Sequence, residues 1–292
     1  MKIDTHNNLI EFGTILLIDH IVIDIQGEDK KVEEFLQGQV TSDVSLLSDN
    51  TSQLSCICNH KGEILADFII IKKNKKYKFI VESNSGLDTI LIDELTPFAK
   101  FSNVEFKKTN EMVVGTISPK SNSNQPFLSN NYFELSISTG INLNKDENSI
   151  CALQWEAANK ILGNLVLEKE DTAKYRPLEI NYDKLRVSFD KGCYRGQEIV
   201  ARMKYLGIDR RKFCTLITEI SFFNQFEGWI QVDSETGRVS IDPDTAPDKK
   251  SRLFKNIGKV INFNSTLVFN VIVKKDDLSM LKDRFSKILE II

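Results

Sequence analysis

The stretch Ser188-Phe189-Asp190-Lys191-Gly192-Cys193-Tyr194-Arg195-Gly196-Gln197-Glu198-Ile199-Val200-Ala201-Arg202 places a cysteine between two cations, in a glycine-containing turn just before a predicted helix. Glu198 and Arg202 stand four residues apart with the carboxylate first, which is the favourable order for an ion pair along a helix. The neighbouring cations and the unpaired amides of a helix N-terminus favour the thiolate over the thiol. The pattern therefore predicts a partly exposed, reactive Cys193, although a free cysteine is also commonly a small buried hydrophobic residue.

The charge of the chain is uneven along its length. The 292 residues carry a formal net charge of −3 and are 41% hydrophobic, which allows two or three packed units. Between Lys184 and Lys212, nine Lys and Arg residues stand against three acidic residues, so this segment carries +6 and the remainder −9. A concentrated basic segment in an acidic chain favours a specific anionic ligand over a bulk polyanion such as nucleic acid.

The cysteine pattern and the hydropathy predict the cellular compartment of the protein. The five cysteines include no C-x-x-C pair. Cys56, Cys58 and His60 alternate along a predicted strand, and this spacing suits strand packing better than zinc binding, so no metal site is predicted. The N-terminus lacks an apolar signal core, and no stretch approaches the roughly 20 apolar residues of a membrane span. We expect a reduced, cytoplasmic protein that does not enter a membrane.

Two local patterns organise the first part of the chain. A helix is expected from Glu28 to Gln37, with Gly38 as its C-terminal stop. Residues 52–58 and 63–71 alternate around Asn59-His60-Lys61-Gly62, a composition typical of a hairpin turn.

The distribution of elements predicts an α+β protein with two domains. Strands and helices are interleaved over residues 1–207, whereas predicted strands dominate residues 208–292. The second domain is therefore expected to be a small β-barrel-like module, closed by a terminal helix over residues 276–289.

Two motifs resemble those of a known family. The pattern Lys-Gly-Cys-Tyr-x-Gly-Gln-Glu-x-x-Ala-Arg over residues 191–202 resembles that of the YgfZ family of folate-binding proteins, which are relatives of the aminomethyltransferase (T-protein) of the glycine cleavage system. The stretch 36–43 resembles the family's N-terminal block, Leu-Gln-Gly-Gln-x-Thr-x-Asp. The resemblance implies a ring-like arrangement of α+β subdomains around a central channel, two of them interleaved within residues 1–207.

The resemblance also implies residues that contact folate. Trp155 matches a family tryptophan that lies against the folate rings, and a flat indole suits a pterin face, although a buried core tryptophan is the alternative. His20 matches the position of a second stacking ring. Arginine suits the folate carboxylates, and amide or carboxylate side chains suit the pterin edge. The other candidate contacts are Lys191, Tyr194, Arg195, Gln197, Glu198, Arg202, Glu179, Gln37 and Gln39.

Three positions depart from the related proteins. The aminomethyltransferases carry an Asp-Asp pair where this chain reads Ala66-Asp67, and a pterin-anchoring Glu where it has Ile161. A family glycine is Arg186 here. Because one acid of the pair is missing, aminomethyl transfer is not the expected activity.

The family resemblance implies a tetrahydrofolate-binding auxiliary protein for iron–sulfur cluster assembly or maintenance. It would act through Cys193 on iron–sulfur proteins such as tRNA-thiolating enzymes, without being a turnover enzyme. Such a thiol can form a mixed disulfide, accept a sulfur or touch a cluster intermediate, but it cannot hold a cluster alone. Two alternatives stay open: a folate-dependent aminomethyltransferase, and a tRNA- or RNA-binding module that uses the basic segment, although no stable nucleic-acid binding is expected.

Overall fold

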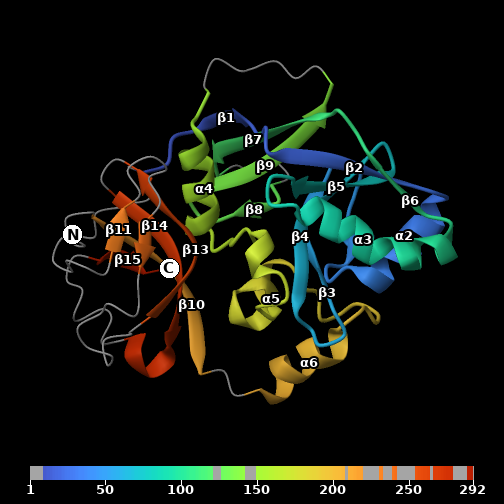
Figure 1. Ribbon diagram of the computed structural model, residues 1–292. Coiled ribbons are helices and arrows are strands. Elements are labelled where there is room, and N and C mark those ends of the chain that lie inside the picture. Colours follow the sequence, from blue (N-terminus) through green and yellow to red (C-terminus); the bar gives the residue numbers. More distant parts are fainter. Residues whose placement is uncertain are drawn as a thin grey trace. The chain divides into compact units, whose positions relative to one another are not determined.

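The computed structural model is a mixed α+β structure, which confirms the predicted fold class (Figure 1). It describes residues 9–120, 126–141, 149–207, 210–219, 230–232, 239–241, 254–263, 266–278 and 288–291. The chain forms two compact units. The motif unit comprises Phe12–Ser149 and Val166–Gly207, and the C-terminal unit comprises Met1–Glu11, Ile150–Leu165 and Ile208–Ile292.

Two antiparallel sheets form the motif unit. In the larger sheet the strand order is β3-β4-β5-β2-β6, and in the smaller sheet it is β1-β7-β9-β8. The strands of the larger sheet are β2 (His20–Gln26), β3 (Ser52–Cys58), β4 (Ile64–Lys73), β5 (Lys76–Glu82) and β6 (Glu105–Lys108). Those of the smaller sheet are β1 (Gly13–Leu16), β7 (Met112–Pro119), β8 (Leu128–Ser129) and β9 (Phe133–Gly140).

Helix α3 (Leu87–Ala99) packs against strands β4, β5 and β6 of the larger sheet (Figure 1). Its buried residues Leu87, Leu91 and Leu95 recur every four positions, so one face of the helix is apolar. This packing matters for the site because the exposed face of α3 carries residues that meet the cysteine motif.

Helix α2 (Asp29–Gln39) continues beyond its predicted end. Gly38 does not stop the helix, because the amide of Val40 still donates to the carbonyl of Leu36 at 2.9 Å and Gly38 lies outside the left-handed region. The predicted stop was therefore wrong by two residues. Gly38 is instead a glycine in the last turn of a helix.

The C-terminal unit joins helix α4 (Ala152–Ile161) to strands from the end of the chain. The Thr215 hydroxyl donates to the Lys160 carbonyl at 2.6 Å, and the Lys160 ammonium donates to Asn270 Oδ1 at 3.1 Å. These buried bonds tie the helix to the sheet. The sheet order is β13-β14-β10-β15, and β11 pairs with β12. The strands are β10 (Arg211–Glu219), β11 (Ile230–Val232), β12 (Val239–Ile241), β13 (Phe254–Phe263), β14 (Thr266–Lys274) and β15 (Ile288–Ile291).

The predicted C-terminal barrel is unconfirmed, because the described strands of this unit form an open sheet with β13 and β15 at its edges. The predicted terminal helix over residues 276–289 falls mostly outside the described residues. Where the structure describes its end, Ile288 and Leu289 belong to strand β15, so the helix prediction was wrong there. The ring-like arrangement and the domain boundary at residue 207 stay predictions. No helix among the described residues is long and apolar enough to cross a bilayer.

Candidate functional site around the exposed cysteine

The motif packs against the hairpin turn between β3 and β4 through two glycines. Gly196, with φ of +87°, precedes α6 (Gln197–Leu206), and a Cβ on it would lie 2.4 Å from the carbonyl oxygen of Asn59. Gly62 in the hairpin turn has φ of +70°, and a Cβ there would lie 3.1 Å from the Cβ of Ile199. Both positions need glycine for conformation and for space. The start of α6 is therefore fixed to the hairpin.

A second attachment lies on the other side of Cys193. The Lys191 ammonium donates to the carbonyl oxygens of Val40 at 2.9 Å and Ser42 at 2.8 Å. Burial lowers the pKa of Lys191 to about 8, although the nearby Asp43 carboxylate opposes this shift. The two motif blocks recognised in the sequence are therefore joined in space through one lysine.

The Cys193 side chain is exposed between these two attachments. In the same unit, Cys56 and Cys58 are buried in β3. The hydrogen bond with the Cys56 thiol, together with burial, raises the pKa of the Cys58 thiol well above its usual value. Of the described cysteines in the motif unit, Cys193 is thus the accessible one. Cys151, in the C-terminal unit, is also exposed.

The charged residues on either side of Gly196 form ion pairs. Arg195 pairs with Glu94 of α3 at 3.1 Å, and its guanidinium lies 5.4 Å from the ring centre of Phe98. Its Nε and Nη2 atoms are buried without a partner among the described residues. Glu198 and Arg202 form the predicted ion pair at 3.1 Å on the exposed face of α6.

Tyr194 is buried, and burial raises the pKa of its phenol. Within the described parts of the chain its hydroxyl has no hydrogen-bond partner. Its amide donates to Oε1 of Gln197 at 3.3 Å, so Gln197 supports the turn. The Lys191 ammonium lies 5.5 Å from the centre of the Tyr194 ring.

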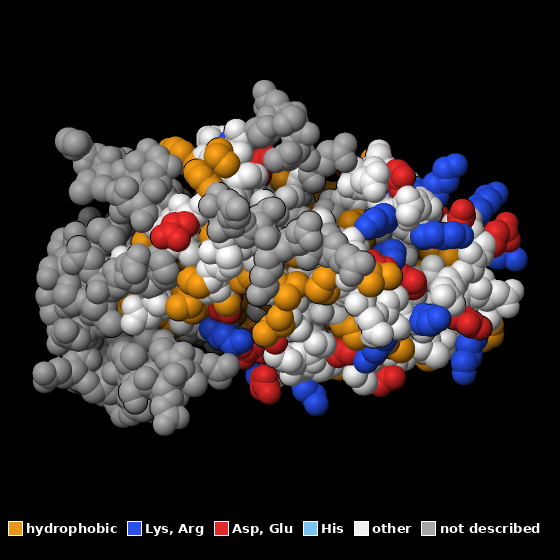
Figure 2. Space-filling view, turned by 90° about the horizontal axis from the view of Figure 1, so that it is seen from above, with side chains coloured by type: hydrophobic (Ala, Val, Ile, Leu, Met, Phe, Trp, Pro, Cys, Tyr) orange, Lys and Arg blue, Asp and Glu red, His pale blue; other side chains and the backbone are white. Residues whose placement is uncertain are grey.

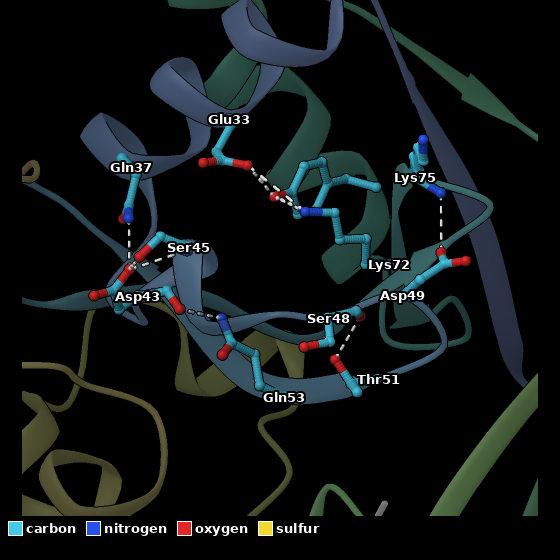
Figure 3. Close-up of polar contacts among 11 residues, drawn as sticks. Glu33, Gln37, Asp43, Ser45, Ser48, Asp49, Thr51, Gln53, Lys72 and Lys75 are labelled. Atoms are coloured by element: carbon cyan, nitrogen blue, oxygen red, sulfur yellow. Dashed lines mark hydrogen bonds and ion pairs between the residues drawn. The ribbon is translucent and has the colours of Figure 1, made fainter.

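Gln37 and Gln39 lie at the end of α2. Figure 3 shows the Gln37 amide directed at Asp43, to which its nitrogen donates at 2.5 Å. The carbonyl oxygens of both glutamines are buried, and no described residue donates to them. Among the described residues these two acceptors have no donor, and the hydroxyl of Tyr194 and two guanidinium nitrogens of Arg195 have no partner.

The remaining predicted site residues belong to other elements of the chain. Glu179 accepts from the Arg176 amide at 2.8 Å and so caps a short 3-10 turn. His20 begins β2, and burial lowers its pKa to about 4, so the ring is neutral at physiological pH. Trp155 is buried in α4 of the C-terminal unit. The structure brings Lys191, Tyr194 and Gln37 into one neighbourhood through Val40 and Asp43, and the folate roles of all these residues stay predictions.

The sequence reasoning missed a buried polar cluster in the motif unit. Arg186 pairs with Asp67 at 3.1 Å, and the Tyr182 hydroxyl donates to the same carboxylate at 2.7 Å. The Arg186 guanidinium also donates to the carbonyls of Ser55 and Phe68. Burial raises the pKa of Asp67, and the Arg186 cation opposes this shift. Two departures seen separately in the sequence, the lone acid and the arginine in place of glycine, form one ion pair.

Several cations of the basic segment are engaged within the chain. Arg186 is 3% exposed, Lys191 is bound to carbonyls, and Arg195 is paired with Glu94. Lys204 pairs with Asp183 at 3.0 Å. Figure 2 views the molecule from the side away from α6, and on that face Lys and Arg side chains are interspersed with Asp and Glu. These pairings leave fewer cations to contact phosphates, as the RNA-binding alternative requires.

The chain is similar to several known proteins, although no family model matches it. An uncharacterized protein of Haemophilus influenzae is 32% identical over 203 residues, covering 68% of this chain and 70% of that protein. The tRNA-modifying protein YgfZ of Vibrio atlanticus is 26% identical over 250 residues, 76% of each chain. YgfZ of Buchnera aphidicola subsp. Schizaphis graminum is 29% identical over 227 residues, 67% of this chain and 70% of that protein.

A solved structure shares the fold. Aminomethyltransferase T of the glycine cleavage system from Bartonella henselae matches with a TM-score of 0.59, covering 91% of this chain and 79% of that one. The identity is 15%, so the likeness concerns the fold alone.

Proposed function

The chain belongs to the YgfZ family, and we propose that it is a tetrahydrofolate-binding auxiliary protein acting through Cys193. Its task would be the assembly or maintenance of iron–sulfur clusters in cytoplasmic proteins such as tRNA-thiolating enzymes. The tRNA-modifying name of the relatives supports this direction, since tRNA thiolation is one route by which an iron–sulfur protein affects tRNA.

One observation carries the proposal: an exposed thiol is held between two fixed points. On the C-terminal side of Cys193, Gly196 packs against the hairpin turn. On its N-terminal side, Lys191 is hydrogen-bonded to the carbonyl of Val40 at the end of α2. A thiol that reacts with another protein must be accessible, and a fixed backbone keeps it in one orientation. Buried cysteines such as Cys56 do not meet the first condition.

The state of Asp67 weighs against aminomethyl transfer as the activity. An acid that acts on a substrate amine must reach it, but Asp67 is 4% exposed and is engaged by Arg186 and Tyr182. The neighbouring position is Ala66. We therefore rank the auxiliary role above the transferase. Steady turnover of methylene-tetrahydrofolate with an amine would favour the transferase instead.

Folate binding is tested by tryptophan fluorescence. The fold shared with an aminomethyltransferase and the family resemblance support folate as the ligand, and Trp155 is its predicted platform. Tetrahydrofolate is expected to quench the fluorescence of the Trp229→Phe variant, which retains Trp155, and not that of Trp155→Phe. Trp229 lies outside the described residues. Equal quenching of both variants, or none, would remove Trp155 from the proposal.

The RNA-binding alternative is tested by retention on immobilised tRNA at increasing salt. We expect no stable retention at physiological ionic strength, because the cations described above are engaged within the chain. Strong retention that falls steeply with salt would favour the alternative.

A further inference from the structure

The guanidinium of Arg186 is surrounded by groups that each attract a cation. Its Nη2 atom lies 3.1 Å from Oδ2 of Asp67, and its Nη1 atom donates to the carbonyl oxygens of Ser55 at 2.9 Å and Phe68 at 3.1 Å. The ring centre of Tyr182 lies 4.5 Å from the guanidinium carbon. A carboxylate, two carbonyl dipoles and an aromatic face together form a cation cage around this side chain.

The walls of the cation cage are held by contacts that do not involve the guanidinium. Ser55 and Phe68 are paired directly opposite each other on β3 and β4, and Asp67 precedes Phe68 on β4. The Tyr182 hydroxyl and the Leu167 amide donate to the same Asp67 oxygen, at 2.7 and 3.4 Å. The sheet and these two donors therefore fix the carboxylate and the carbonyls in place.

The backbone of Arg186 is also held independently of its side chain. Arg186 follows the short helix α5 (Tyr182–Leu185), and its amide donates to the Tyr182 carbonyl at 2.7 Å. Its own carbonyl accepts from the Thr41 hydroxyl at 2.7 Å. Its φ of −128° lies outside the left-handed region, so other residues adopt this conformation readily. Removal of the side chain should therefore leave a vacancy in the cage with little movement of the chain.

The cation cage and the guanidinium are shielded from water. Asp67, Arg186 and the other members of the cage are at most 4% exposed. A carboxylate taken out of water is costly unless a cation pairs with it. An apolar pair of similar volume avoids this cost and is often as stable. Since the chain keeps a buried carboxylate here, the cage needs a cation in it at all times.

We propose that the cation cage is a binding site for a small cation with several N–H groups, and that Arg186 is an occupant supplied by the chain itself. Guanidinium, amidinium and primary ammonium ions have this chemistry, because three oxygen acceptors and an aromatic face match several donors on one charged group. While Arg186 fills the cage, it excludes amines from Asp67. Residue 186 thus determines what this site accepts, an inference that goes beyond the proposed role of Cys193.

Rescue of Arg186→Ala by free guanidinium tests the cage. Melting temperatures are measured in millimolar guanidinium chloride and in sodium chloride at the same ionic strength. A ligand that binds the folded state alone raises the melting temperature. At roughly ten times its dissociation constant, guanidinium should raise that of Arg186→Ala by about 2–4 °C. The wild-type chain and Arg202→Ala, which lacks an exposed arginine instead, should show no such gain.

Related solutes separate the charge of the ligand from its shape. Urea is planar but neutral and should not raise the melting temperature of Arg186→Ala. Methylammonium should raise it, at higher concentration than guanidinium, because it offers fewer donors. Adding Asp67→Asn to Arg186→Ala removes the carboxylate charge and should abolish the response to guanidinium. A response to urea as large as that to guanidinium would reveal a cavity without preference for cations and would overturn the proposal.

A second measurement applies if Arg186→Ala does not fold without a ligand. The native fraction recovered after dilution from urea is then measured by circular dichroism. Guanidinium should raise this fraction for Arg186→Ala and leave that of Arg202→Ala unchanged. No guanidinium effect in either measurement, or an equal effect on the wild-type chain, would overturn the cage as a cation site. Because every variant here retains Cys193, a failed rescue leaves the proposed function standing.

Discussion

The buried cluster around Asp67 and the turn that carries Cys193 lie in the same unit but differ in how their reactive groups are exposed to solvent. Asp67 lies inside the sheet, where Arg186 and Tyr182 satisfy its carboxylate. Cys193 is exposed, and its neighbours fix the backbone while leaving the thiol free. The difference teaches that the carboxylate of Asp67 is engaged within the fold, whereas the thiol of Cys193 is accessible from outside it.

The largest effect on stability is expected from Arg186→Ala. The change leaves a buried carboxylate without its cation, and breaking a buried pair from one side costs about 3–5 kcal/mol of the free energy of unfolding. Urea denaturation measures it. As the exposed counterpart, Arg202→Ala removes a surface pair and should cost less than about 1 kcal/mol. Similar costs for the two variants would erase the distinction between the regions.

A smaller loss is expected from Gly196→Ala. The new methyl group would sit in the left-handed region and against the Asn59 carbonyl, so about 2–4 kcal/mol of the free energy of unfolding should be lost. Gly192→Ala, four residues earlier, places the same group in open space and should change stability by less than about 0.5 kcal/mol. If Gly196→Ala is equally mild, the turn is not held by the hairpin.

The pH dependence of stability should carry a modest contribution from Lys191. Its pKa in the folded chain is about 8, against 10.5 ordinarily, so between these values the unfolded chain binds the extra proton. Stability from this group therefore rises with pH from about 8 upward. Lys191→Arg, which stays charged in both states, should flatten the rise in urea midpoints between about pH 8 and 9.5, below the tyrosine range. A steeper rise in the variant would contradict this assignment.

Local patterns in the sequence predicted the local structure around the site. Alternation around residues 59–62 predicted the hairpin, and the spacing of Glu198 and Arg202 predicted their ion pair. Gly38 misled the prediction of the helix end, because nothing nearby forces the chain out of the helical conformation until Val40. A glycine near a helix end only tends to stop the helix. Here Leu36 and Val40 are both buried in the core, and their packing favours helical conformation through Gln39.

Contacts between distant parts of the sequence were not predictable from spacing. The close packing of Gly196 against Asn59 joins two turns, and neither turn has an unusual composition on its own. The pairing of Asp67 with Arg186 did leave a signal, since the chain lacks one acid and gains one cation relative to the family pattern. Reading those two departures together would have predicted a pair, whereas the part of Tyr182 had no sequence signal.

The central claim is that Cys193 is the working group of the protein, and complementation tests it most directly. Cells that lack the protein are supplied with Cys193→Ser or, as the matched exposed cysteine, Cys151→Ser, and the thiolated nucleosides of their tRNA are quantified. Both variants should keep the wild-type melting temperature, because neither thiol is buried. We expect Cys151→Ser to restore thiolation and Cys193→Ser to leave it unrestored. Full restoration by Cys193→Ser would contradict the claim.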